Sequence, residues 1–125
     1  MKFFAKIMAA LLFTALAAQA EDSIISNMKA LQNGVDMIQK GFVNNSRVLI
    51  DEGIREIMKN TKAYKHLSDK RKHLKNVAYN NLKDIEKNVK SMTLALAKRD
   101  YHAASEAYGH ILVNCAACHA TVRKW

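Results

Sequence analysis

Two cysteines and a histidine near the end of the chain are the residues best suited to chemistry. The segment Cys115-Ala116-Ala117-Cys118-His119 has the C-x-x-C-H form, which is the attachment signature of c-type haem. Cysteines three positions apart lie on one face of a helix, about one turn from each other. Their sulfurs can therefore form thioether bonds along one porphyrin edge, while the next side chain reaches the iron. The motif predicts one covalently bound haem c, attached through Cys115 and Cys118, with His119 as an axial iron ligand.

Other uses of the same residues fit the sequence less well. A thioredoxin-type thiol pair belongs to a βαβ pattern, and the sequence shows none. A structural zinc site needs a fourth ligand, yet neither His102 nor His110 forms a recognised second ligand pair with the motif. A disulfide across two intervening residues is strained inside a helix. The alternative left open is an exported helical module, without haem, for metal binding or protein interaction.

The first twenty residues predict a secretory signal peptide. A positively charged start is followed by an apolar run over 7–18, and Ala18-Gln19-Ala20 offers small residues at the signal peptidase positions. The run is short for a membrane span. A retained anchor is the alternative, but the acidic pair after Ala20 favours cleavage. We therefore expect residues 1–20 to be removed and 21–125 to form one periplasmic domain, with the membrane involved only through the leader. Because c-type haem is attached outside the cytoplasm, the leader and the motif agree.

Composition limits the functions that the mature chain can have. About 100 residues provide one modest core. The formal charge is +9 for the whole chain and +7 without the two lysines of the leader, so the surface is basic and could meet acidic partner proteins. The basic residues lack interleaved aromatics, so we expect no nucleic-acid partner. No carboxylate pair, nucleophile–base pair or phosphate loop stands out, and we expect no enzymatic activity.

The elements that must position the motif are predicted to be helices. The chain contains no proline and only four glycines, and its apolar residues recur every three or four positions. The first helix is predicted over about 22–40, with Gly41 as its C-terminal stop. Its apolar seam consists of Ile24, Met28, Leu31, Val35, Ile38 and Phe42.

Three further helices follow in the sequence. Ser46 is a candidate N-cap for the second helix, which is expected to weaken over 59–65. Ser68 or Asp69 would cap the third, and the pair Arg99-Asp100 would form the turn before the fourth. Amphipathic helices joined by short loops predict an all-α protein, an antiparallel four-helix bundle with a C-terminal haem-attachment helix.

This layout resembles the cytochrome c′ family, which includes low-spin relatives with a methionine as sixth ligand. The resemblance covers the mature chain in layout and is firm in sequence only over 115–123. It implies that His119 is the proximal ligand. It also implies that Arg123, a basic residue one turn further on, lies beside this histidine or screens the haem propionates. The alternative for Arg123 is a cation favoured at the end of a helix.

The resemblance also places the distal residue on the first helix, where Met28 is the candidate. A Met/His pair raises the reduction potential and suits electron transfer, although a methionine in an apolar seam can be simple core packing. The family often has an arginine four residues before the distal position, where this chain has Ile24. A shift of one turn would instead bring Ile25 to the iron, leaving it five-coordinate. Met37 is a weaker alternative ligand.

Two haem functions follow from these ligand sets. Met28 ligation predicts a periplasmic electron carrier for redox partner proteins, which the basic segment over 59–75 would attract if they are acidic. A five-coordinate iron would instead bind small gases such as nitric oxide or carbon monoxide. Family members commonly dimerise through their first helices, but no spare apolar face is evident for this homodimer. His66 and His73 are expected at the surface, and His102 and His110 are expected to have surface or packing roles rather than to bind the iron. Tyr101, Tyr108 and Trp125 are expected to fill core or surface, with contact to the porphyrin as the alternative.

Overall fold

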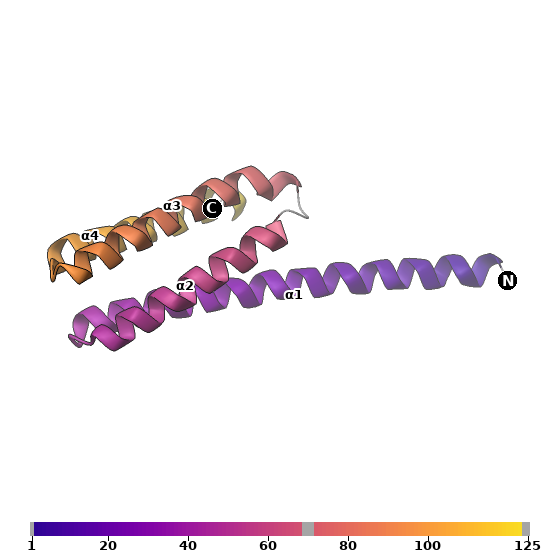
Figure 1. Ribbon diagram of the computed structural model, residues 1–125. Coiled ribbons are helices and arrows are strands. Elements are labelled where there is room, and N and C mark those ends of the chain that lie inside the picture. The colour runs from indigo at the N-terminus through magenta and orange to yellow at the C-terminus, as the bar shows by residue number, and fades with distance from the viewer. Residues whose placement is uncertain (1, 69–71, 124–125) are drawn as a thin grey trace.

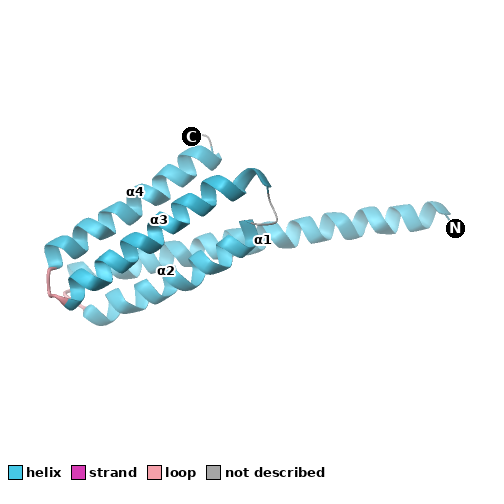
Figure 2. Cartoon of the chain, turned by 45° about the horizontal axis from the view of Figure 1, so that its top comes forward, coloured by secondary structure: helices cyan, strands magenta, loops and turns pink. Residues whose placement is uncertain are grey.

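Four helices make up the protein in the computed structural model, which describes the backbone of residues 2–68 and 72–123 and the side chains of 23–66 and 76–122. The helices are α1 (Lys2–Val43), α2 (Arg47–Ser68), α3 (Lys72–Ala97) and α4 (Tyr101–Arg123). The described residues contain no strand. Consecutive helices run in opposite directions, and the turns after α1 and after α3 lie at the same end (Figures 1 and 2). The predicted all-α four-helix bundle is confirmed.

The bundle is built from two helical hairpins. Helix α1 packs closely on α2 and α3 packs closely on α4, whereas α2 and α3 make a smaller interface between the hairpins. Close pairing of neighbours is expected when amphipathic helices are joined by turns of three residues. The fourth side of the bundle, between α1 and α4, is the least closely packed and leaves room for a ligand.

The predicted apolar seams form the core. Ile38 from α1, Ile57 from α2, Met92 and Leu96 from α3 and Ile111 from α4 are fully buried. Burying one such side chain contributes about 1.5–3 kcal/mol to folding. The other seam residues of α1 pack against this core but are only partly buried: Ile24, Met28, Leu31, Val35 and Phe42. All of these except Phe42 line the cavity described below, which explains their partial exposure.

The turns before α2 and α4 each provide a capping residue, Ser46 as the sequence predicted and Asp100 from the predicted turn. The side-chain oxygen of Ser46 accepts a hydrogen bond from the Leu49 amide at 3.4 Å. At the start of α4, the carboxylate of Asp100 accepts one from the Ala103 amide at 3.0 Å. Each cap satisfies an amide that has no partner inside its helix.

The predicted end of the first helix was wrong. Helix α1 passes through Gly41 to Val43, and Asn45 instead takes the left-handed conformation, with φ 52°. Gly41 is buried, and a Cβ there would meet the Ile50 side chain and lie 2.9 Å from the Ile50 amide nitrogen. This glycine therefore permits close helix packing rather than ending a helix.

The second helix also differs from its prediction. Helix α2 does not weaken over 59–65 but continues to Ser68, because Thr61 and Tyr64 are buried and Lys65 forms a 2.8 Å ion pair with Glu86 of α3. Ser68 therefore belongs to α2 and does not cap α3. The other predicted cap, Asp69, lies outside the described residues.

Helix α1 is longer at its N-terminus than the sequence predicted. It begins at Lys2, and its first half extends beyond the other three helices (Figure 1). Removal of a leader over 1–20 stays a prediction. Within the described part of the chain, no helix has both the length and the apolar character needed to cross a membrane.

Candidate functional site

A cavity of about 470 Å³ lies between the two hairpins, on the open side between α1 and α4. Its volume lies within the range of cofactor and small-molecule sites, about 300–1,000 Å³. All four helices contribute to the lining, which is mostly apolar: Ile24, Ile25, Met28, Lys29, Leu31, Gln32, Val35, Asp36, Gln39, Tyr64, Asn81, Leu82, Ile85, Tyr108, Leu112, Cys115, Cys118 and His119.

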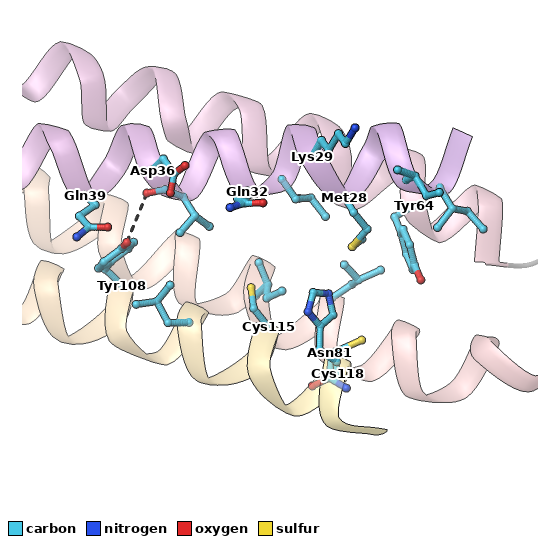
Figure 3. A pocket seen from close by; sticks show the side chains of 18 residues that line it. Met28, Lys29, Gln32, Asp36, Gln39, Tyr64, Asn81, Tyr108, Cys115 and Cys118 are labelled. Atoms are coloured by element: carbon cyan, nitrogen blue, oxygen red, sulfur yellow. Dashed lines mark hydrogen bonds between the residues drawn. The ribbon is translucent and has the colours of Figure 1, made fainter. Parts of the chain in front are cut away.

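The α4 wall carries the residues of the C-x-x-C-H motif. Cys115, Cys118 and His119 all line the cavity, and Figure 3 shows both cysteine side chains on this wall. Both cysteines are partly buried with free thiols, and His119 is more exposed. The structure therefore brings all three predicted residues to one wall of one cavity. No disulfide joins Cys115 to Cys118, so both thiols are available for reaction.

The opposite wall belongs to α1. Met28 lines the cavity, and its side chain extends from α1 toward α4 (Figure 3). Ile25 lines the same wall and is 43% exposed. Met37, the weaker candidate, is not part of the lining, and its sulfur accepts a hydrogen bond from Asn33 at 3.8 Å. Met28 and Ile25 therefore face the cavity, whereas Met37 does not.

Helix α3 provides the apolar floor of the cavity. Leu82 and Ile85 are both buried there. Next to them, the side-chain amide of Asn81 donates a hydrogen bond to the carbonyl of Val77 at 2.8 Å. The same surroundings act on the thiols: burial raises the pKa of Cys115, with a further contribution from the neighbouring Cys118, and burial also raises the pKa of Cys118. Buried thiols favour the neutral form.

Tyr108 is a site residue whose contacts the sequence did not reveal. Its hydroxyl donates a hydrogen bond to the backbone carbonyl of Val35 at 3.4 Å, the dashed line in Figure 3. Its ring also contacts Phe42, with centroids 5.9 Å apart. Burial raises the pKa of Tyr108, and the charges of Asp36 and Cys115 raise it further. The available signal was that Tyr108 precedes Cys115 by seven residues, two turns along the same face of α4.

Some predicted residues lie away from the site or outside the described side chains. Helix α4 ends at Arg123, but the side chain of Arg123 is outside the described residues, so its role stays a prediction. The same holds for His73 and Trp125. His66 is exposed, as predicted, and His102, His110 and Tyr101 are exposed as well.

The cavity suits a haem in its donor set and in its walls. Two thiols and an imidazole share one wall, a thioether lies on the wall opposite, and apolar residues enclose the space between them. No three His, Cys, Asp or Glu side chains gather into a metal-holding group among the residues described, which include Cys115, Cys118 and His119.

The chain was compared with protein-family models, with characterised proteins and with solved structures, and none of them matches it.

Proposed function

We propose that this protein is an exported monohaem c-type cytochrome that carries electrons. The observation that supports it is the position of the C-x-x-C-H motif: Cys115, Cys118 and His119 line an apolar cavity whose opposite wall carries Met28. A five-residue motif at an exposed helix end would offer no enclosure for a porphyrin. Here three of the five residues, Cys115, Cys118 and His119, line a space of suitable size and polarity.

Each residue of the site has a distinct part in this proposal. Cys115 and Cys118 would hold the porphyrin by thioether bonds, His119 would bind the iron on one side, and Met28 on the other. The bound haem would supply a one-electron couple between ferric and ferrous iron. A neutral thioether raises the reduction potential, and it can remain bound in both oxidation states.

The rest of the cavity lining controls solvent access. Leu31 and Val35 on α1 and Leu82 and Ile85 on α3 exclude water from the enclosed part. A dry, low-dielectric environment disfavours added charge on the iron and so tunes its potential. At the mouth, Ile25 and Leu112 remain 43% and 42% exposed, so one edge of the cavity is open to a partner protein.

The proposal also includes the protein family and the cellular location that the sequence resemblance implies. A helical bundle with its haem motif near the end of the last helix is similar to the cytochrome c′ family. Membership would place the protein in the periplasm after removal of residues 1–20, and would place Arg123 beside His119. An acidic redox partner could approach the exposed lysines of α2, Lys59 and Lys62, whereas Lys65 is already paired with Glu86.

A gas-binding function is the second candidate, and one observation favours it. Ile25 lies on the same cavity wall as Met28, about one helical turn away. If Ile25 faces the iron, no side chain there can ligate it, and the sixth position stays available to nitric oxide or carbon monoxide. The ligand on the α1 side therefore decides between electron transfer and gas binding.

Absorbance spectra of the oxidised and reduced protein test this function, using protein made in a host that matures c-type haem. A sharp reduced α band and a sulfur-to-iron charge-transfer band, the latter lost in Met28→Ala, would establish Met/His ligation. High-spin spectra in the wild type, with rapid carbon monoxide binding, would support the gas-binding candidate instead. A colourless protein would exclude both.

A further inference from the structure

Tyr108 connects two helices that otherwise make little contact. Its hydroxyl donates to the Val35 carbonyl at 3.4 Å, and its ring packs on Phe42. Both partners belong to α1, whereas Tyr108 belongs to α4. Because α1 packs chiefly on α2 and α4 chiefly on α3, these two contacts hold the hairpins together on the open side of the bundle.

The positions of these contacts matter for the cavity. Met28 lies seven residues before Val35 on α1, and Cys115 lies seven residues after Tyr108 on α4. Seven residues are two helical turns, about 10 Å along the axis. Since α1 and α4 run in opposite directions (Figure 2), both intervals lead from the Tyr108 contact toward the same part of the cavity, as Figure 3 shows.

The directions of the side chains bring Met28 and His119 closer to the same level along the cavity. Helical side chains lean toward the N-terminus of their own helix. Met28 therefore leans away from the Tyr108 contact, and His119, which lies one turn beyond Cys115, leans back toward it. The spacing between these two side chains then depends on how closely α1 approaches α4, because the cavity between them contains no packed core to fix it.

We propose that Tyr108 is a positioning residue that fixes the approach of α1 to α4 and thereby the distance between the Met28 wall and the His119 wall. Its consequence for the iron rests on the proposed function. The inference applies to whichever of Met28 or Ile25 faces the iron, because both lie on the wall that Tyr108 positions. Loss of the hydroxyl should loosen this wall while the ring contact with Phe42 keeps the fold.

Tyr108→Phe is the variant that removes the hydroxyl alone, and Tyr101→Phe is its control, since Tyr101 is 53% exposed on the same helix. Hydrogen exchange measured by mass spectrometry on the full chain is the first measurement. We expect α1 over 24–35 to exchange about fivefold faster in Tyr108→Phe, the effect of losing one neutral hydrogen bond, with α2 unchanged. Equal exchange in wild type and variant would overturn the inference, with or without haem.

Carbon monoxide binding to the ferrous protein is the second measurement. A looser α1 wall should raise the association rate of carbon monoxide by about the same factor and increase the high-spin fraction, with no change in Tyr101→Phe. Faster exchange without a change in rate or spin state would refute the effect on the iron. If Tyr108→Phe fails to fold, Phe42→Leu removes the ring contact instead and should give the same two changes.

Absence of haem from the wild-type mass would defeat the proposed function and the effect on the iron. The exchange measurement would still show whether Tyr108 holds α1 against α4, so the two failures are distinguishable.

Discussion

Met28 and Ile25 lie about one turn apart on the same wall of the cavity, and the proposed haem function depends on which of them would face the iron. A thioether adds a sixth ligand, whereas a branched alkyl group leaves the position without one. Met28 belongs to the seam of α1 and packs against the core, whereas Ile25 lies outside the seam and is 43% exposed, but both side chains line the cavity. Packing alone therefore does not determine which of them would face the iron, and spectra of single variants distinguish the two cases.

With the proposed Met28–His119 ligation, Met28→Ala should convert the bound haem from low-spin to high-spin. Loss of a thioether ligand lowers the reduction potential, by on the order of 100 mV given the range that axial ligands span. Absorbance and redox titration measure both changes. Met37→Ala is the matched control, because Met37 is not part of the cavity lining. An unchanged spectrum in Met28→Ala would exclude it as the iron ligand.

Tyr108 should make stability depend on alkaline pH. Its pKa is raised in the folded protein by burial, by Asp36 and by Cys115, and the contribution of Cys115 would vanish once that thiol becomes a thioether. A raised folded pKa means that the stabilisation is complete below the unfolded value, about 10, and is lost as pH rises through the folded value.

Urea unfolding between pH 8 and pH 11, the range spanning the unfolded pKa of about 10, measures this dependence. The wild type should lose free energy of unfolding above pH 10 more steeply than Tyr108→Phe, while Tyr101→Phe keeps the wild-type slope. Identical slopes in wild type and Tyr108→Phe would show that the hydroxyl is not buried in solution.

At the scale of the elements, close packing of α1 on α2 depends on glycines that face each other. A Cβ on Gly53 would lie 2.7 Å from the Ile38 side chain and 3.0 Å from its amide nitrogen, and one on Gly34 would lie 3.0 Å from the carbonyl oxygen of Gly53. Backbone atoms cannot move aside as a flexible side chain can. The α1–α2 hairpin therefore has a fixed crossing that excludes larger residues.

Gly53→Ala should destabilise the protein by about 1–3 kcal/mol, as overpacked sites do, despite the better helix propensity of alanine. Gly109→Ala is the matched control: a Cβ there meets nothing within 4 Å, so alanine should stabilise α4 by up to about 1 kcal/mol. Thermal and urea unfolding report both. Stabilisation by both substitutions would contradict the close crossing.

The sequence predicted those elements whose causes are local. The apolar seams, the Ser46 cap and the turn at Arg99-Asp100 follow from spacing and residue type, and the structure contains all of them. Gly41 was misinterpreted because a glycine that ends a helix and one that permits close packing look alike until the neighbouring helix is placed. The weak stretch over 59–65 became helical through burial and an ion pair with α3.

The site, too, could be predicted only in part from the sequence. Cys115, Cys118 and His119 follow from a five-residue motif, and the structure brings them to one cavity wall with Met28 opposite. The contacts of Tyr108 with Val35 and Phe42 join residues more than sixty positions apart. The spacing of apolar residues does not show which residues of two helices meet, so these contacts could be found only in the structure.

At the scale of the whole molecule, two tightly paired hairpins enclose a cavity along the side where they meet least closely. Most of the packing lies within the hairpins, α1 on α2 and α3 on α4, while the seam between α1 and α4 is where the proposed haem would bind. A covalently held porphyrin would fill that seam and join the hairpins. Attachment should then raise the stability of the whole bundle, since a ligand that binds only the folded state shifts the equilibrium toward it.

The intact mass of the protein, purified from the periplasm of a host with c-type haem maturation, tests the haem proposal most directly. Cys115→Ala/Cys118→Ala, made in the same host, is the control. We predict that the wild type is heavier than residues 21–125 by one haem and coloured after denaturation, and that the double variant has the mass of its polypeptide alone. A wild-type mass equal to that of the polypeptide would contradict covalent haem attachment and every function proposed from it.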